Sequence, residues 1–362
     1  MMSQGQIKSA FEPDEIRIPV PGLHLQVTVN ERASYAATAA ALQLDRLWLA
    51  IAEDNAAHTV RVQMPADLMT FALLPGAQPA VLAGGVPFKR HQLNQHCPGR
   101  DYHQTTEGPS LTGSIMLAPE ALCGFAAAMG ATLPTTNVNQ LIEPSVYALQ
   151  RLLRLHLSAM RLVRETPDLI SRAEAMRGLE NAVLDALLGC VSGAAAEPST
   201  AAQRNHQDII RKFDDVLAAH DTSSLYMGDV AAMIGVSARS LRACCQEHLG
   251  MGPKYFLMLR RLHMVRRRLI NGTTDTVSVT DAATEFGFWE LGRFSVAYRE
   301  AFDESPSATL RREPRDGRPA MSWSSAASGF GSAGNAWAGS RWAAALSWIG
   351  DMERNVGLQH GI

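Results

Sequence analysis

The stretch Asp229-Val-Ala-Ala-Met-Ile-Gly235 returns later in the chain, in degenerate form, as Asp281-Ala-Ala-Thr-Glu-Phe-Gly287. The residues after each glycine also correspond, because Leu241, Cys245, Leu249 and Pro253 return as Phe294, Tyr298, Phe302 and Pro306. Each unit therefore predicts a short helix, a glycine-centred turn and a second helix with an apolar face. That layout is typical of a helix-turn-helix, whose second helix enters the DNA major groove.

The residues around each turn fit this prediction. Gly235 and Gly287 each follow an apolar run, where a chain leaving a helix often adopts positive φ. Ser237 stands where an N-cap is expected. We therefore predict recognition helices over residues 237–249 and 290–302.

The segment Lys254–Ile270 predicts one amphipathic helix between the two units. It carries six Lys/Arg and no acid, and its apolar positions recur at spacings of three and four. A helix of this length could hold two recognition helices near one turn of duplex apart. Basic side chains on it would meet phosphates, which position a protein without reading sequence. The expected phosphate contacts are Ser237, Lys254, Arg260, Arg266, Arg267, Arg268 and Ser295.

From about Asp208 to Arg312, the chain resembles the DNA-binding domain of the AraC/XylS family of bacterial transcription regulators. The matching positions are Asp229-Val-Ala, Gly235-Val-Ser237, Leu249-Gly250-Met-Gly-Pro253, Arg260-Arg261-Leu262, Gly287-Phe288, Phe294-Ser295 and Ser305-Pro306-Ser307. The resemblance implies base contacts from Arg239, Arg242, Ala243, Gly292, Arg293 and Val296. Two positions depart from the family pattern: Cys245 replaces a large aromatic residue, and Val296 replaces a basic one.

The formal net charge of −2 does not exclude DNA, because the charge is unevenly divided. Residues 1–203 hold 14 Lys/Arg against 18 Asp/Glu, whereas residues 204–312 hold 15 against 13. Only the footprint on DNA needs to be basic. The length of 362 residues favours at least two domains.

The first part of the chain predicts a β-rich domain. Segments 23–29 and 58–64 alternate apolar and polar residues, and 68–74 and 111–117 are short apolar runs. Turn pairs such as Gly84-Gly85 separate them. We expect a small β-roll or barrel over residues 15–118, followed by helices at 120–129, 146–164 and 173–191. The second helix carries an apolar stripe that suits either a core or a dimer seam: Leu149, Leu152, Leu153, His156, Met160 and Val163.

The expected fold class is therefore α+β multidomain, with a β-rich roll or barrel and helices before an all-α double helix-turn-helix. We place the first domain at 1–192, a flexible linker at 193–202 and the DNA-binding domain at 203–312. Residues 313–362 form a tail that holds four of the six tryptophans. This tail is expected to be largely disordered, with a docking helix around Trp342 as the alternative.

Few residues of the first domain are candidates for a metal site, a ligand pocket or a catalytic site. His91, His96, Cys97 and His103 are metal-ligand types, but their spacing matches neither a structural zinc site nor a cupin barrel. We expect no metal and no cofactor, and treat His91, His96 and His103 as candidates for a small-molecule pocket. No catalytic triad or phosphate-binding loop is present, so an enzyme is not expected. The acidic pairs Glu53-Asp54 and Asp214-Asp215 read as solvated surface groups.

Cysteine usage and hydropathy predict a cytoplasmic protein. The five cysteines are an odd number without a CxxC pair, which favours reduced thiols. The chain lacks a secretory leader pattern and a run of about eighteen apolar residues, so no membrane association is expected.

These observations together predict a sequence-specific transcription regulator that binds double-stranded DNA. The resemblance implies a ligand-responsive activator, a homodimer, a small-molecule effector and contact with RNA polymerase. Two alternatives stay open. One is a cupin-like metalloenzyme domain fused to a DNA-binding domain, and the other is a constitutive DNA-binding dimer without a ligand.

Overall fold

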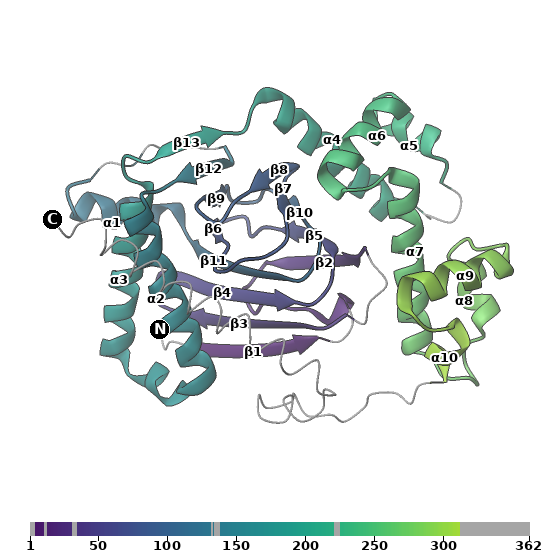
Figure 1. The fold of residues 1–362 in the computed structure, drawn as a ribbon, viewed down its shortest axis with the longest axis horizontal. Helices are drawn as coiled ribbons and strands as arrows, with labels where there is room; N and C mark the ends of the chain where they lie inside the picture. The colour runs from purple at the N-terminus through teal and green to yellow at the C-terminus, as the bar shows by residue number, and fades with distance from the viewer. Residues whose placement is uncertain are drawn as a thin grey trace.

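The computed structural model describes residues 4–10, 13–30, 35–131, 133, 138–220 and 225–311. The tryptophan-bearing tail, including the helix considered around Trp342, lies outside these residues. Within them the fold has the expected α+β order, a β-rich domain with helices followed by an all-helical domain (Figure 1).

Two antiparallel sheets form the first domain. The larger sheet has the order β1 (Gln4–Ala10), β3 (Ala37–Gln43), β4 (Leu47–Asp54), β11 (Ser110–Leu117), β6 (Met69–Leu73), β9 (Leu93–His96), β12 (Gln140–Glu143) and β13 (Ala195–Pro198). The smaller sheet has the order β2 (His24–Val29), β5 (His58–Gln63), β10 (Tyr102–Thr106), β7 (Val81–Ala83) and β8 (Val86–Phe88). Short 3₁₀ helices occur at Pro13–Glu15 and Pro167–Ser171.

The central strands of the larger sheet, β3, β4 and β11, are buried on both faces. On one face Ala41, Ala50 and Met116 share a core with Val60 and other residues of the smaller sheet. On the other face the sheet packs against α2 (Val146–Glu165) and α3 (Ala173–Val191), with α1 (Pro119–Ala128) beside them (Figure 1). The two sheets thus form the roll, and the helices complete a second core.

The apolar stripe of α2 belongs to this second core. Its six predicted members are all buried within the chain. His156 lies among them, with Nε2 3.1 Å from the carbonyl oxygen of Ala50. Burial of its ring lowers the pKa of His156 to about 4, so this histidine is neutral near pH 7. The stripe therefore stabilises the domain and is not a free dimer seam.

The segment predicted to be a flexible linker is ordered. Ala195–Pro198 pairs with β12 as the edge strand β13, and helix α4 (Ala201–Ala219) begins directly afterwards. Thr200 and Gln203 form a capping box at its start. Backbone pairing and capping need no large side chains, so the small residues that suggest flexibility are compatible with this order.

The second domain contains α4, α5 (Met227–Ile234), α6 (Ala238–Leu249), α7 (Pro253–Ile270), α8 (Val279–Glu285), α9 (Leu291–Phe302) and α10 (Pro306–Leu310). In Figure 1, α7 runs between the α4–α6 group and the α8–α10 group. Residues from both groups and from α7 share one hydrophobic core, in which Leu241, Leu262 and Phe294 are buried. The two helical units are thus parts of a single domain.

Both predicted turns have the same geometry. Gly235 has φ 80° and Gly287 has φ 81°. The next residue in each case donates its amide back into the preceding helix, Val236 to the Ala231 carbonyl and Phe288 to the Ala283 carbonyl. This is the Schellman pattern that ends a helix at a left-handed glycine. The internal repeat in the sequence therefore corresponds to a structural repeat.

Replacing Gly235 with Ala is expected to destabilise the protein by about 1–2 kcal/mol, because an L-residue is strained at positive φ. Gly228 is the matched control: it lies in α5, and a Cβ added there would meet nothing within 4 Å. Gly228→Ala should leave stability unchanged or raise it by up to about 1 kcal/mol. Urea denaturation of the two variants measures both values, and equal effects would contradict the role of the turn.

The described part of the chain includes no helix that is both long and apolar enough to span a membrane. All five cysteines carry free thiols, and four of them are buried, with Cys123 exposed.

Candidate DNA interface

The first unit presents a polar face on α6. Ser237 caps this helix, because its Oγ accepts a hydrogen bond from the Ser240 amide at 3.0 Å. The buried face consists of Leu241, Cys244, Cys245, His248 and Leu249. Arg239, Arg242 and Ala243 lie on the opposite face and are exposed. The structure thus places these three predicted base contacts together on one side of the helix.

The second unit has the same arrangement on α9. Phe294 and Tyr298 are buried, whereas Gly292, Arg293 and Val296 are exposed. Arg293 is 84% exposed and pairs with Glu290, Nε to Oε2 at 3.0 Å. An exposed pair of this kind contributes little to stability, so the guanidinium can exchange Glu290 for another partner at small cost.

The predicted phosphate contacts fall into two groups. Lys254, Arg267 and Arg268 are exposed on α7, and Ser237 is exposed at the start of α6. Ser295 is half-buried and donates its hydroxyl to the Leu291 carbonyl at 2.9 Å.

Arg260 and Arg266 differ from the expectation. The side chain of Arg260 is 13% exposed and faces Asp214. That of Arg266 is 11% exposed, pairs with Glu304 and lies over the ring of Phe302 at 4.7 Å. Both guanidinium groups therefore serve internal ion pairs. The spacing of apolar residues predicted that both side chains lie on the solvent-facing side of α7. Their acidic partners are far away in the sequence, so the ion pairs could not be predicted.

A set of ionisable residues that could not be predicted from the sequence joins the two domains. Asp214 of α4 is only 1% exposed. Its Oδ2 lies 3.1 Å from His103 Nε2 and 3.5 Å from Arg61 Nε, and its Oδ1 lies 3.9 Å from Arg260 Nη1. We call Arg61, His103, Asp214 and Arg260 the junction cluster. It corrects the reading of Asp214 as a solvated acid.

The charge balance of the junction cluster favours an ionised Asp214. Burial alone would raise the pKa of this carboxyl. The nearby His103, Arg61 and Arg260 outweigh that effect, so the pKa of Asp214 lies below its usual value.

Glu53 and Asp54 are also buried, at 5% and 6% exposure, and were likewise misread as surface acids. Asp54 accepts a hydrogen bond from the Ser110 hydroxyl at 2.6 Å.

The first domain also caps the end of α6. Thr105 donates its hydroxyl to the His248 carbonyl at 3.1 Å, and Thr59 donates to the Leu249 carbonyl at 3.2 Å. The last carbonyls of a helix have no partner within it, so these donors satisfy groups that would otherwise need water. Helix α6, the first predicted recognition helix, is therefore held at its C-terminal end by strands of the other domain.

A third contact connects the first domain to α7. His263 Nε2 accepts a hydrogen bond from the Val29 amide at 3.3 Å, and its ring packs against Phe302 at 5.1 Å between centroids. Burial, followed by the charge of Arg266, lowers the pKa of His263 to about 4. The ring is thus neutral near pH 7, as an acceptor must be.

The three histidines proposed as a small-molecule pocket lie in different surroundings. His91 is 60% exposed and lies 3.7 Å from Glu143. His96 is buried and stacked on Tyr102 with ring centroids 3.6 Å apart, and burial lowers the pKa of His96 to about 3. His103 belongs to the junction cluster. Among the described residues these three form no common group that could hold a metal ion.

Comparison with known proteins agrees with this geometry. Residues 230–312 match a family model described as "Helix-turn-helix domain". Over 106 residues, 29% of this chain, the sequence is 37% identical to the probable thc operon regulatory protein of Rhodococcus erythropolis, of which the match spans 32%. Over 254 residues, 67% of this chain, it is 27% identical to the HTH-type transcriptional activator RhaS of Klebsiella pneumoniae, covering 81% of that protein.

One solved structure is similar over the C-terminal domain alone. It is a probable AraC family transcriptional regulator from Rhodopseudomonas palustris, with 31% identity, 29% of this chain and 96% of that chain covered, and a TM-score of 0.27. The chain spans about a third of the length of the thc operon relative.

The fold and the family match define the C-terminal domain as a double helix-turn-helix DNA-binding domain. Its sequence is similar to that of AraC/XylS-family regulators, as its motifs predicted.

Proposed function

We propose that the whole chain is a sequence-specific transcription regulator that reads two adjacent segments of duplex DNA through α6 and α9. The observation that supports it is the repeated unit. In each of the two units, one helix face is buried in a shared core and the other presents exposed arginine. Arginine in the major groove can pair bidentately with guanine. Helix α7, 18 residues or about 27 Å long, separates the two units.

In this proposal the bases are contacted by Arg239, Arg242, Ala243, Gly292, Arg293 and Val296. Phosphates are contacted by Ser237, Lys254, Arg267, Arg268 and Ser295. Capture of fragmented genomic DNA by the full-length protein, followed by sequencing, tests the proposal. A two-part motif spaced by one helical turn is expected. Uniform retention without a motif would contradict sequence-specific reading.

Replacing Arg239 with Ala is expected to weaken binding to a captured site by about 1–3 kcal/mol and to relax preference at one base position. Arg267→Ala should instead weaken all sequences to a similar extent and flatten the dependence of affinity on salt. Fluorescence anisotropy with a captured site and a scrambled duplex, each at several salt concentrations, separates the two effects.

The control for both variants is Arg177→Ala, since Arg177 is exposed on α3 of the other domain. It should bind DNA like the unchanged protein. If Arg239→Ala and Arg267→Ala behave alike on both duplexes, the division into base and phosphate contacts is wrong.

We further propose that the protein is a cytoplasmic, ligand-responsive activator that acts as a homodimer with RNA polymerase and has no enzymatic activity. Relatives named as transcriptional activators support the direction of regulation. The contacts of Thr59 and Thr105 with the end of α6 support a route by which the first domain influences DNA binding. A thermal-shift screen of metabolites tests the effector. DNA affinity that is identical with and without every metabolite would favour a constitutive regulator.

A further inference from the structure

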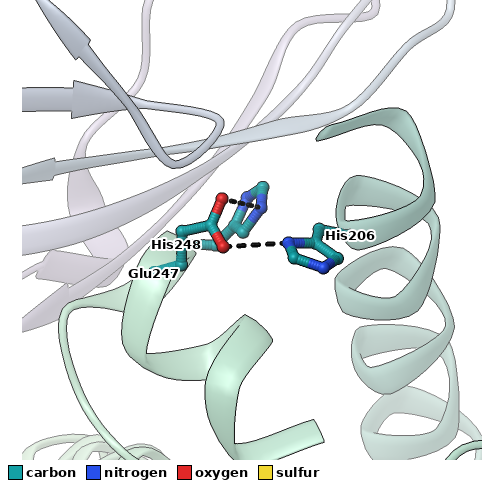
Figure 2. Close-up of side chains that lie close together, drawn as sticks. All are labelled: His206, Glu247 and His248. Atoms are coloured by element: carbon teal, nitrogen blue, oxygen red, sulfur yellow. Dashed lines mark hydrogen bonds and ion pairs between the residues drawn. The ribbon is translucent and has the colours of Figure 1, made fainter. Parts of the chain in front are cut away.

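Three metal-ligand side chains converge where α4 meets the end of α6. In Figure 2, dashed lines join the two carboxylate oxygens of Glu247 to one ring nitrogen each of His206 and His248. His206 Nδ1 lies 2.9 Å from Glu247 Oε2, and His248 Nε2 lies 3.8 Å from Glu247 Oε1. One ligand atom from each residue lies within 4.8 Å of the others. The three residues thus form a compact group drawn from two helices.

His248 carries an unsatisfied nitrogen that points into this group. The residue is 1% exposed, and within the described part of the chain its Nε2 makes no hydrogen bond. A buried polar atom without a partner destabilises the fold. Metal ions bind imidazole through an unprotonated ring nitrogen of this kind.

The backbone of the first domain approaches this nitrogen closely. Gly85 lies in the turn between β7 and β8, and a Cβ added there would come within 2.9 Å of His248 Nε2 and 3.1 Å of Glu247 Cγ. Any side chain at position 85 would crowd both residues. The glycine therefore keeps the wall next to the unsatisfied nitrogen free of side-chain atoms.

We infer that His206, Glu247 and His248 bind one divalent transition-metal ion of the zinc type, with water as a fourth ligand. Two imidazole nitrogens and a carboxylate oxygen suit zinc, whereas magnesium and calcium prefer oxygen alone. Ligands at about 2.0–2.1 Å from a tetrahedral ion lie roughly 3.3 Å apart. The two histidine–carboxylate separations, 2.9 and 3.8 Å, lie on either side of this value, and the three ligand atoms all lie within 4.8 Å of one another. Side-chain rotations would therefore complete the site.

Such an ion would brace the end of the first recognition helix. It would tie the last turn of α6 to α4, directly beside the first domain, whose Thr105 donates to the His248 carbonyl. This site goes beyond the proposed function, because metal binding can be measured without any DNA.

Titration of chelator-treated full-length protein with Co²⁺, followed by visible absorption, tests the site. One equivalent per chain is expected, with the ligand-field bands of a four-coordinate ion and displacement by Zn²⁺. His206→Ala and Glu247→Gln should each weaken Co²⁺ binding at least tenfold. His220→Ala is the matched control on the end of α4, because His220 is exposed and lies outside the group. It should bind like the unchanged protein.

Melting temperature provides a second measurement that separates ligand loss from misfolding. Metal-free variants should melt like the metal-free parent, since His206 and Glu247 are only half-buried. Zn²⁺ should then raise the melting temperature of the parent and of His220→Ala, but not of the ligand variants. The site is disproved if the parent binds no Co²⁺, or if His206→Ala and Glu247→Gln bind it as tightly as the parent.

Discussion

Asp214→Asn is expected to lower the free energy of unfolding by about 3–5 kcal/mol, the range for removing one partner of a buried ion pair. The substitution keeps the shape of the side chain but removes the anion that faces Arg61, His103 and Arg260. Arg260 would keep its charge at 13% exposure with its partner neutralised. Urea denaturation of the full-length protein at pH 7 measures the effect.

Asp215→Asn provides the matched control. Asp215 is the next residue and also faces Arg61, at 3.7 Å, but it is 56% exposed. Its loss should cost less than about 1 kcal/mol. Equal losses for the two variants would show that burial of Asp214 is not what matters.

The junction cluster also predicts a sensitivity to acid. The pKa of Asp214 is lowered in the folded protein. Its carboxylate therefore contributes fully to the free energy of unfolding above the pKa of the unfolded state, about 3.9. The contribution is lost as pH falls through the folded value.

The second large effect is a loss of stability, which we expect between pH 6.5 and 4. The pKa of His156 and of His263 is 6.5 in the unfolded chain, and burial lowers the pKa of each to about 4 in the folded protein. In this window the unfolded chain binds protons that the folded chain does not, so stability falls as pH falls. Each histidine should contribute a loss of about 3 kcal/mol. Urea denaturation at half-unit pH steps follows the decline.

His263→Gln tests the assignment. An amide oxygen can still accept from the Val29 amide but does not titrate, so the variant should lose stability less steeply over the same window. His220→Gln, at an exposed position, should leave the slope unchanged. A slope that His263→Gln does not alter would assign the acid sensitivity to other groups.

Local signals predicted the C-terminal domain closely because its elements are specified by nearby residues. The positive φ of Gly235 and Gly287 and the Ser237 cap follow from the residue types alone. In the first domain, β3 and β4 were missed. Both strands are buried on two faces, so the alternation that marked β2 and β5 is absent from them.

The site residues could be predicted only where they depend on the face of a helix. Arg239 and Arg293 are exposed as periodicity predicted. The partner of Arg260 could not be predicted, because Asp214 approaches it from another helix, and Arg61, which also pairs with Asp214, belongs to the other domain. The same holds for His206, which is 41 positions from Glu247. Contacts of this kind depend on the packing of distant elements, which residue spacing does not encode.

The caps that Thr59 and Thr105 place on α6 limit how this protein can be recombined with others. A chimera joined within β13 would supply the helices of the second domain with a foreign first domain. Unless the foreign domain carried hydroxyls at equivalent positions, the His248 and Leu249 carbonyls would lack hydrogen-bond donors. Exchange of the first domain would therefore succeed only when these two threonines are transplanted with Arg61 and His103, as a patch of four side chains.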